Sequence, residues 1–351
     1  MKKSSFLLLI IFVICIIEFS PAVKADVKNY TLNPQIIFRE REDDENYLIS
    51  GGYGIAVDNT GAFYILDGKE FCVKKYDSSG KFIVKFGNPG QGPGELFQPR
   101  DIQFLGDKIL VLQFDKLHVF NLDGSLVETR AREFELFDYS EKNIKFYSNW
   151  RKYVFTGNDI AEERFFLEIV DKSEKTGRII ESVKTGKTSF SPRKNEMIII
   201  FTMDIFFDVD DRGIVIFAQD GENRDLKIFE NGKIQVIHRV KGSPVPLPPD
   251  ALKKEQMHFK AVRNQGLNYP EKTHYSVITG VFFDGDDIML RIRTKERTGL
   301  LRLSRAGIEE AFYAENDDTA KENHLVIRNN MIYYLINDPD EGVIVKRAKL
   351  N

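Results

Sequence analysis

The chain has 351 residues, of which 42% are hydrophobic and 29% are charged, and its formal net charge at pH 7 is −3. A slightly acidic chain lacks the excess of Lys and Arg that a nucleic-acid-binding surface needs, so nucleic acid is not an expected partner. The chain has two cysteines but 28 Phe and 13 Tyr. We therefore expect packing of aromatic rings, which bury roughly 150 to 250 Å² each, to stabilise the fold in place of disulfides.

The first 25 residues have the pattern of an export signal. Two lysines precede an uncharged apolar run from Phe6 to Ile17, and small residues follow up to Ala25. A helix over this run would be about 18 Å long, shorter than the roughly 30 Å hydrocarbon core of a membrane. We expect a signal peptide over residues 1–25, with a retained anchor as the alternative, and a secreted or periplasmic domain over residues 26–351 without a stable membrane span.

Removal of that signal would leave a net charge of about −5 and a single cysteine, Cys72. An intramolecular disulfide is then impossible. Cys72 lies between Phe71 and Val73 in a predicted strand, where a buried and unreactive thiol is the expected state.

A unit of two hairpins recurs along the chain with a period of roughly 45 residues. In the first unit, the turns Asp58-Asn59-Thr60-Gly61 and Asp77-Ser78-Ser79-Gly80 separate short runs of apolar residues. Asn and Gly tolerate the positive φ that such turns require. Four strands with two turn signals make one blade of a propeller, and a repeat of this size must pack against its neighbours to bury its apolar faces.

We predict five complete blades and a sixth that is incomplete. The third blade has the weakest pattern, because its turn from 171 to 177 is long and charged. In chain order the predicted strands are 55–57, 63–66, 71–76 and 82–86; 101–104, 108–112, 117–121 and 126–129; 144–147, 153–155, 165–170 and 178–183; 205–207, 214–217, 226–229 and 234–237; 277–283, 288–292, 300–303 and 308–312; and 325–327, 331–336 and 343–347.

An insertion over residues 240–275 separates the fourth blade from the fifth. It opens with a proline-rich segment, 242–249, that does not suit the interior of a sheet. A short helix is predicted to follow, with Asp250 as its N-cap. The helix is either a lid over the central channel or a docked structural element.

The sixth blade lacks a fourth strand before the chain stops at Asn351. An unpaired sheet edge is unfavourable. The segment Gln35 to Arg39 belongs to no other hairpin. We therefore predict that it completes the last blade and closes the ring.

Several segments resemble NHL repeats, namely Gly54-Ile55-Ala56-Val57-Asp58, Gly61 to Asp67, Asp77 to Phe82, and Phe86-Gly87 with Gly90 to Ile102. The chain is similar more broadly to the bacterial extracytoplasmic six-bladed propeller proteins, closely over residues 51–129 and least in the third blade. This resemblance implies an all-β fold, a six-bladed β-propeller of four-stranded antiparallel blades. The fold leaves the function open.

No local motif indicates a cofactor or a catalytic centre. The glycine-rich segment from Gly87 to Gly94 contains Pro89 and Pro93 and is not followed by a helix pattern. We therefore interpret it as a loop between blades and not as a phosphate-binding loop. Residues 208–213 begin like a calcium loop, but Arg212 stands at a ligand position, which favours a hairpin turn. The five histidines show no pair at helical metal-ligand spacing, and no G-x-S-x-G motif occurs.

Residues just before each inner strand should crowd the mouth of the channel. Those candidates are Tyr53, Arg100, Asp204 and Tyr275. Arg100 is the foremost ligand contact because a guanidinium can bind a carboxylate with two hydrogen bonds. The structural alternative is that Arg100 pairs with a neighbouring Asp and stabilises the ring.

The sequence thus favours a non-catalytic binding module that takes a protein, a peptide or a small ligand at the channel mouth. The rival hypothesis is an enzyme. Propellers of the gluconolactonase and strictosidine synthase-like type hold a metal, often calcium, on axial side chains from separate blades. The resemblance therefore also admits a metal-dependent hydrolase or lactonase.

Overall fold

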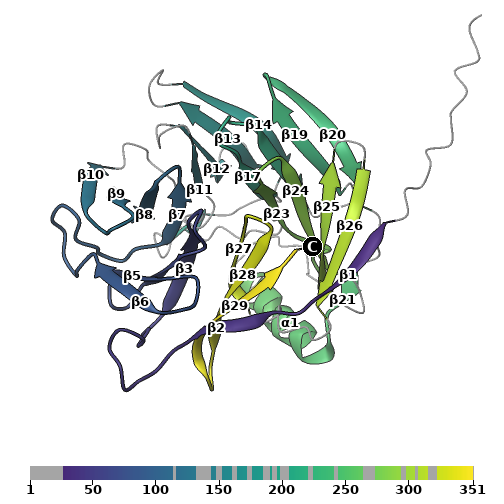
Figure 1. The fold of residues 1–351 in the computed structure, drawn as a ribbon. Helices are drawn as coiled ribbons and strands as arrows, with labels where there is room; N and C mark the ends of the chain where they lie inside the picture. The colour runs from purple at the N-terminus through teal and green to yellow at the C-terminus, as the bar shows by residue number, and fades with distance from the viewer. Residues whose placement is uncertain are drawn as a thin grey trace, which may run out of the picture.

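The computed structural model describes residues 27–113, 116–131, 144–147, 152–159, 164–171, 176–184, 190–191, 196–197, 205–219, 224–240, 244–263, 273–293, 298–304, 307–314 and 322–350. Six antiparallel sheets stand around a central axis in this part of the chain (Figure 1). The fold is a six-bladed β-propeller, as the repeat predicts.

Each blade has four neighbouring strands. The innermost strand of each blade contacts the innermost strands of both neighbouring blades around the axis. Blade one contains β3 (Gly52–Val57), β4 (Phe63–Asp67), β5 (Cys72–Tyr76) and β6 (Phe82–Phe86). Blade two contains β7 (Asp101–Leu105), β8 (Lys108–Leu112), β9 (Lys116–Asn121) and β10 (Leu126–Ala131). Blade three contains β11 (Ile144–Tyr147), β12 (Lys152–Asp159), β13 (Arg164–Asp171) and β14 (Thr176–Lys184).

The second half of the ring repeats this arrangement. Blade four contains β17 (Ile205–Val209), β18 (Val215–Gln219), β19 (Asp225–Glu230) and β20 (Lys233–Arg239). Blade five contains β23 (Ile278–Asp284), β24 (Asp287–Arg293), β25 (Thr298–Ser304) and β26 (Gly307–Ala314). Blade six contains β27 (Glu322–Arg328), β28 (Met331–Asp338) and β29 (Gly342–Lys349).

The ring is closed by β2 (Gln35–Arg39), which pairs antiparallel with β29 as the outer strand of blade six. In Figure 1 the purple β2 lies beside the yellow β29. Phe38 is 3% exposed, and its ring packs against those of Tyr47, Phe63 and Tyr76. The predicted closure by residues from the start of the chain is confirmed.

A strand that the sequence analysis did not predict, β1 (Lys28–Leu32), adds a fifth strand to blade five. It runs parallel to β26, and the ring of Tyr30 stacks on that of Phe312 at 5.3 Å. A parallel partner so distant in sequence leaves no local turn signal, which is why the hairpin pattern does not show β1.

The hydrophobic core is divided into six clusters, and each cluster fills the space between two neighbouring blades. Between blades one and two, for example, Tyr64 and Leu66 pack with Ile109 and Val111. Because both faces of these sheets are covered, the strands carry nearly continuous apolar runs such as the fully buried Phe63–Asp67.

The insertion between blades four and five contains the helix α1 (Pro249–Arg263). The helix begins one residue before Asp250, so Asp250 lies in the first turn and is not the N-cap that the sequence predicts. Proline suits the first helical position because its φ is fixed near the helical value and its missing N–H is not needed there. The insertion also forms a short ladder between β21 (Val245–Pro246) and β22 (His274–Tyr275), and β15 (Phe190–Ser191) pairs with β16 (Glu196–Met197) after blade three.

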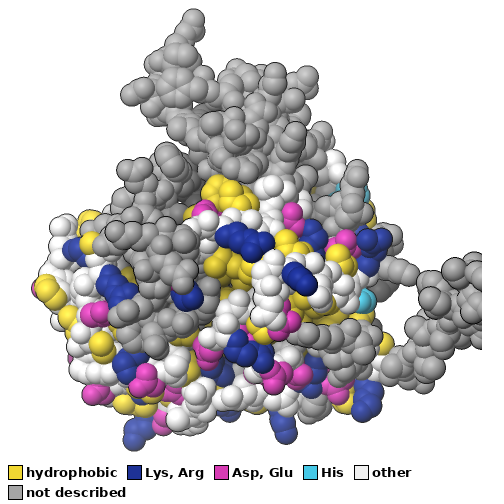
Figure 2. All heavy atoms as spheres, turned by 90° about the horizontal axis from the view of Figure 1, so that it is seen from above, with side chains coloured by type: hydrophobic (Ala, Val, Ile, Leu, Met, Phe, Trp, Pro, Cys, Tyr) yellow, Lys and Arg dark blue, Asp and Glu magenta, His cyan; other side chains and the backbone are white. Residues whose placement is uncertain are grey.

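Within the described ranges, no helix is long and apolar enough to cross a membrane. On the face drawn in Figure 2, Lys and Arg side chains are intermixed with Asp and Glu side chains. This mixture agrees with the nearly balanced charge of the sequence.

Candidate functional site in the central cavity

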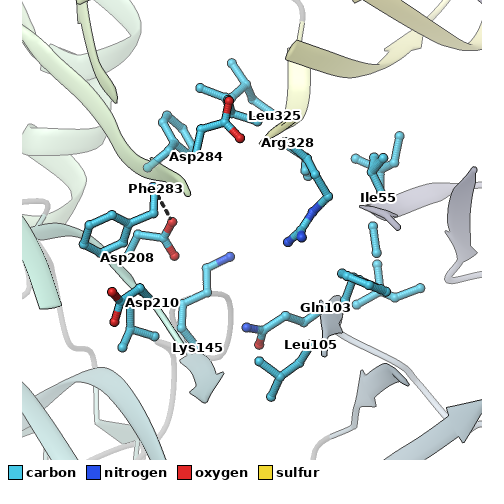
Figure 3. A pocket seen from close by; sticks show the side chains of 18 of the residues that line it. Ile55, Gln103, Leu105, Lys145, Asp208, Asp210, Phe283, Asp284, Leu325 and Arg328 are labelled. Carbon is cyan, nitrogen blue, oxygen red and sulfur yellow. Dashed lines mark hydrogen bonds between the residues drawn. The ribbon is translucent and has the colours of Figure 1, made fainter. Parts of the chain in front are cut away.

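A cavity of about 400 Å³ lies on the axis of the ring. Its lining residues come from the inner strands of all six blades, β3, β7, β11, β17, β23 and β27 (Figure 3). Most lie at the carboxyl ends of these strands or in the turns that follow, where Asn59, Asp211, Gly285 and Asn329 are found. The cavity therefore belongs to the end of the ring that carries the first hairpin of each blade.

Lys145 projects into the cavity from β11 in blade three (Figure 3). Its neighbours Ile144 and Phe146 are buried in the core between blades two and three. Because side chains alternate along a strand, Lys145 lies on the opposite face of β11 and points away from that core. The ammonium group forms no ion pair with any residue that the structure describes.

Arg328 projects into the same cavity from the end of β27 in blade six (Figure 3). Its guanidinium carbon lies 4.6 Å from the centre of the Phe104 ring, and Nη1 donates a hydrogen bond of 3.1 Å to Oδ1 of Asn59. Its Nε is buried and has no hydrogen-bond partner among the described residues. Burial lowers the pKa of the guanidinium and nearby carboxylates such as Asp208 oppose this effect, but an arginine side chain remains charged in proteins.

Asp208 faces these two cations from β17 in blade four. Its Oδ2 accepts a hydrogen bond of 2.9 Å from the backbone N–H of Phe283 in blade five. Burial raises the pKa of this carboxyl, and the charge of Lys145 and the bond from Phe283 act in the opposite direction. Asp208 thus joins two blades while its carboxyl faces the cavity.

Other polar groups of the wall have structural partners. The side-chain amide of Gln103 donates to the carbonyl of Phe146 and accepts from its N–H, both at 3.0 Å. Oδ2 of Asp284 accepts from the N–H of Asn330 at 2.7 Å, and Asp210 pairs with Arg212. In this part of the wall, the cations Lys145 and Arg328 keep the most donor capacity for a ligand.

The residues predicted from the sequence lie elsewhere. Tyr53 is 41% exposed and lies against Gly51 and Gly68, while Arg100 is exposed and precedes β7. Tyr275 lies in β22, 4.6 Å below the guanidinium carbon of Arg293. Asp204 is outside the described residues. None of the three described candidates lines the cavity, and neither do the described residues of the 240–275 insertion.

The sequence analysis missed the cavity residues because it considered only the beginnings of the inner strands. Lys145 and Asp208 lie between apolar neighbours in inner strands, and Arg328 follows the apolar run Leu325 to Ile327 at the end of β27. A charge within a buried, axial strand is unfavourable unless it is paired or faces water. Such interruptions are the signal that could have indicated these residues.

The motifs that the sequence analysis set aside have structural roles in the described residues. Asp210 accepts hydrogen bonds from the N–H groups of Arg212 and Ile214, so residues 208–213 contain a hairpin turn. The glycine-rich segment lies between β6 and β7, where Glu95 accepts from the N–H of Gly92. Cys72 is buried, and burial raises the pKa of its thiol to about 11. The described residues contain no group of three or more metal-ligating side chains.

Comparison with known proteins agrees with this architecture. Residues 42–210 match the model of the domain family DUF5128, which is described as a 6-bladed beta-propeller. No curated protein matches the sequence. The similarity of folds extends over almost the whole chain in the two structures that follow.

A candidate exported protein from Bacteroides fragilis NCTC 9343 has a TM-score of 0.52 at 13% identity, with 93% of this chain and 99% of that chain covered. A member of the duf4221 family from Bacteroides vulgatus ATCC 8482 has a TM-score of 0.51 at 11% identity, with 90% and 97% covered. Sequence, sheet topology and these similarities together identify the chain as a six-bladed β-propeller.

Proposed function

We propose that this protein is an exported, NHL-like propeller that binds a small polar molecule in its central cavity and does not transform it. A volume of about 400 Å³ lies within the range of small-molecule sites, roughly 300 to 1,000 Å³. Six packed inner strands supply a rigid wall, which reduces the ordering cost of binding.

One observation carries the choice of binding over catalysis. Asp208 and Asp284 of the cavity wall accept backbone N–H bonds that join neighbouring blades, and Asp210 is held by its own turn. Besides these carboxylates, the wall presents the cationic donors Lys145 and Arg328. Their ammonium and guanidinium groups donate charged hydrogen bonds and can hold a ligand.

Export is supported by two features. Residues 1–25 have the charge and hydropathy pattern of a signal peptide. The fold is shared with the candidate exported protein from Bacteroides fragilis. Attachment of a reporter enzyme that is active only outside the cytoplasm, with and without residues 1–25, tests this part of the proposal.

The binding function is tested by filling the cavity. A panel of low-molecular-weight polar metabolites is screened for molecules that raise the melting temperature of the wild type. Leu325 lines the cavity, so the Leu325→Trp substitution should abolish the rise that a binding molecule produces. Leu126→Trp is the matched control, because Leu126 is 37% exposed on β10 and outside the cavity. A binder that stabilises both variants equally, or that is recovered chemically altered, contradicts the proposal.

The same panel addresses the metal-dependent alternative. After exhaustive dialysis against EDTA, binding should be unchanged if the cavity works through its own side chains. A stoichiometric divalent ion that survives dialysis and is required for binding would favour the enzymatic hypothesis instead.

A further inference from the structure

We infer that the molecule bound in the cavity carries a carboxylate, which lies between Lys145 and Arg328. This inference rests on the proposed binding function and specifies the chemical class of the ligand. Within the described residues neither cation forms a salt bridge, although both project into one cavity and both interact electrostatically with the carboxylate of Asp208.

The first argument is the placement of the two charges. Lys145 comes from blade three and Arg328 from blade six, which are opposite each other in a ring of six. Figure 3 shows both side chains pointing inward toward the space between them. Two positive charges directed into one cavity repel each other, and a ligand carboxylate between them would be attracted to both, in addition to the carboxylate of Asp208.

The second argument is the preorganisation of Arg328. Its guanidinium is fixed by the ring of Phe104 and by the amide oxygen of Asn59. The buried Nε lacks a hydrogen-bond partner in the part of the chain that the structure describes. A buried donor without a partner is costly, and a ligand oxygen that reaches this group would remove the cost. The planar arrangement of guanidinium donors matches the two oxygens of a carboxylate.

The carboxylates of the cavity wall limit the charge and the polar groups that the rest of the ligand can carry. The cavity wall also contains the carboxylates of five aspartates, Asp101, Asp208, Asp210, Asp211 and Asp284. These groups repel a multiply charged anion such as phosphate, but they can accept hydrogen bonds from hydroxyl or ammonium groups. A small hydroxy acid or amino acid therefore fits the charges of the wall better than an inorganic anion does.

The experiment compares acids with their amides. Glycerate, lactate and the α-amino acids are titrated into the full protein by calorimetry, each against its primary amide, with inorganic phosphate as a further probe. We expect at least one acid to bind, and we expect the corresponding amide and inorganic phosphate to bind at least tenfold more weakly. The amide lacks the charge that strengthens hydrogen bonds to Lys145 and Arg328.

Variants assign the binding to the two cations. Lys145→Met should weaken binding of the acid at least tenfold, and Lys233→Met, at an exposed position of β20, should leave it unchanged. Arg328→Gln should weaken binding of the acid as Lys145→Met does. The affinity of Arg328→Lys should lie between those of Arg328→Gln and the wild type, because lysine keeps the positive charge but lacks the planar guanidinium donors. Melting temperatures show whether each variant is folded. Apart from its electrostatic interaction with Asp208, the Lys145 side chain forms no hydrogen bond or salt bridge with a residue that the structure describes, so its variant stays informative if Arg328→Gln unfolds.

Three results would overturn the inference. They are equal affinity for an acid and its amide, undiminished affinity in Lys145→Met, and no binding of any acid in the series. In the last case a neutral binder from the metabolite panel would still support the proposed function, so the two proposals fail separately.

Discussion

Aspartate and glycine at the turns are the residues by which the sequence specifies its hairpins. In the turns that begin at Asp58, Asp77 and Asp210, the Asp Oδ1 accepts the N–H two residues later at 2.8 to 3.0 Å. The fourth residue of each turn is a glycine with φ between +82° and +88°. This backbone conformation is accessible to glycine without a steric penalty. The same local chemistry therefore produces the same turn in different blades.

Gly80 tests how strictly one turn depends on glycine. A Cβ at this position would lie 1.9 Å from the carbonyl oxygen of Ile37 in β2, and φ is +88°. Gly80→Ala should lower the free energy of unfolding by more than the roughly 1 to 2 kcal/mol of left-handed strain alone. Gly106→Ala is the control, because its φ is +65° and nothing lies within 4 Å of the added Cβ. Equal losses in urea denaturation would show that the contact with Ile37 is unimportant.

Asp208 links the cavity to the pH dependence of stability. Its pKa is raised in the folded protein, chiefly by burial, and is only partly restored by Lys145 and Arg328. The ionised form is therefore disfavoured by folding, so its contribution to stability declines as the pH rises from the unfolded pKa, about 3.9, through the folded value. Asp208→Asn removes this loss and retains an oxygen acceptor for the N–H of Phe283.

We expect the Asp208→Asn variant to melt at a higher temperature than the wild type at pH 7, with the difference shrinking below about pH 4, where the aspartic acid is protonated in both states. Thermal denaturation followed by circular dichroism across this pH range measures the effect. A difference that does not change with pH would mean that the carboxyl does not titrate abnormally.

Candidate site residues were less predictable from sequence than the turns that surround them. Turn chemistry is local, so Asp77 and Gly80 are recognised from four consecutive residues. Lys145 and Arg328 lie in different blades, and only the closed ring brings them to one cavity. Tyr53 and Arg100 do not line this cavity, because they lie at or before the beginnings of β3 and β7 while most lining residues lie near the carboxyl ends of the inner strands, and their place at a channel mouth stays a prediction.

At the level of strands, neighbouring blades are joined by side chains that bind the backbone of the next blade. Gln103 binds Phe146 across blades two and three, Asp208 binds Phe283 across blades four and five, and Asp284 binds Asn330 across blades five and six. Asn337 donates to the carbonyl of Gly52 at 2.8 Å across blades six and one. These polar contacts fix the register of adjacent blades, which apolar packing alone does not specify.

The closing strand β2 should contribute its stability mainly through one side chain. Phe38→Ala removes a ring that is 3% exposed and should cost about 3 to 5 kcal/mol. Ile36→Ala on the same strand removes a side chain that is 47% exposed and should cost much less. Chemical denaturation of both variants checks this ordering. Comparable losses would place the stabilisation in the backbone pairing with β29.

The strands of blades one to six could be predicted because each has a partner close in sequence and a turn signal between them. The closing strand was predictable by counting, since blade six lacked one strand. In contrast, β1 pairs in parallel with β26. Its residues Lys28 to Leu32 show no alternation of apolar and polar side chains and no adjacent turn signal from which a strand could be predicted. With Asp250 as the N-cap the helix would begin at residue 251, but α1 begins two residues earlier because proline suits the first helical position.

For the whole molecule, the ring is a cycle of six similar hydrophobic interfaces, and each blade contributes to two of them. The interface between blades six and one contains residues from both regions of the chain, such as Phe38 and Val345. Stability is therefore expected to depend on closure more than on any single blade.

Deletion of residues 26–41 tests the closure of the whole ring. The deletion removes β1 and β2 and leaves the outer edges of β26 and β29 without partners. We expect a lower melting temperature together with concentration-dependent aggregation, because unpaired strand edges template pairing with other chains. Light scattering during heating measures both effects. A monomer that melts at the wild-type temperature would contradict a stabilising role for closure.

The hydrogen bond from the N–H of Val343 to Oε2 of Glu40 joins positions 303 residues apart. During synthesis, the residues that form β2 emerge early and must wait unpaired until β29 has also left the ribosome. Loop closure over such a separation is slow, so we expect late assembly of blade six to limit the rate of maturation. A prematurely terminated chain would then remain non-native however many finished blades it already contained.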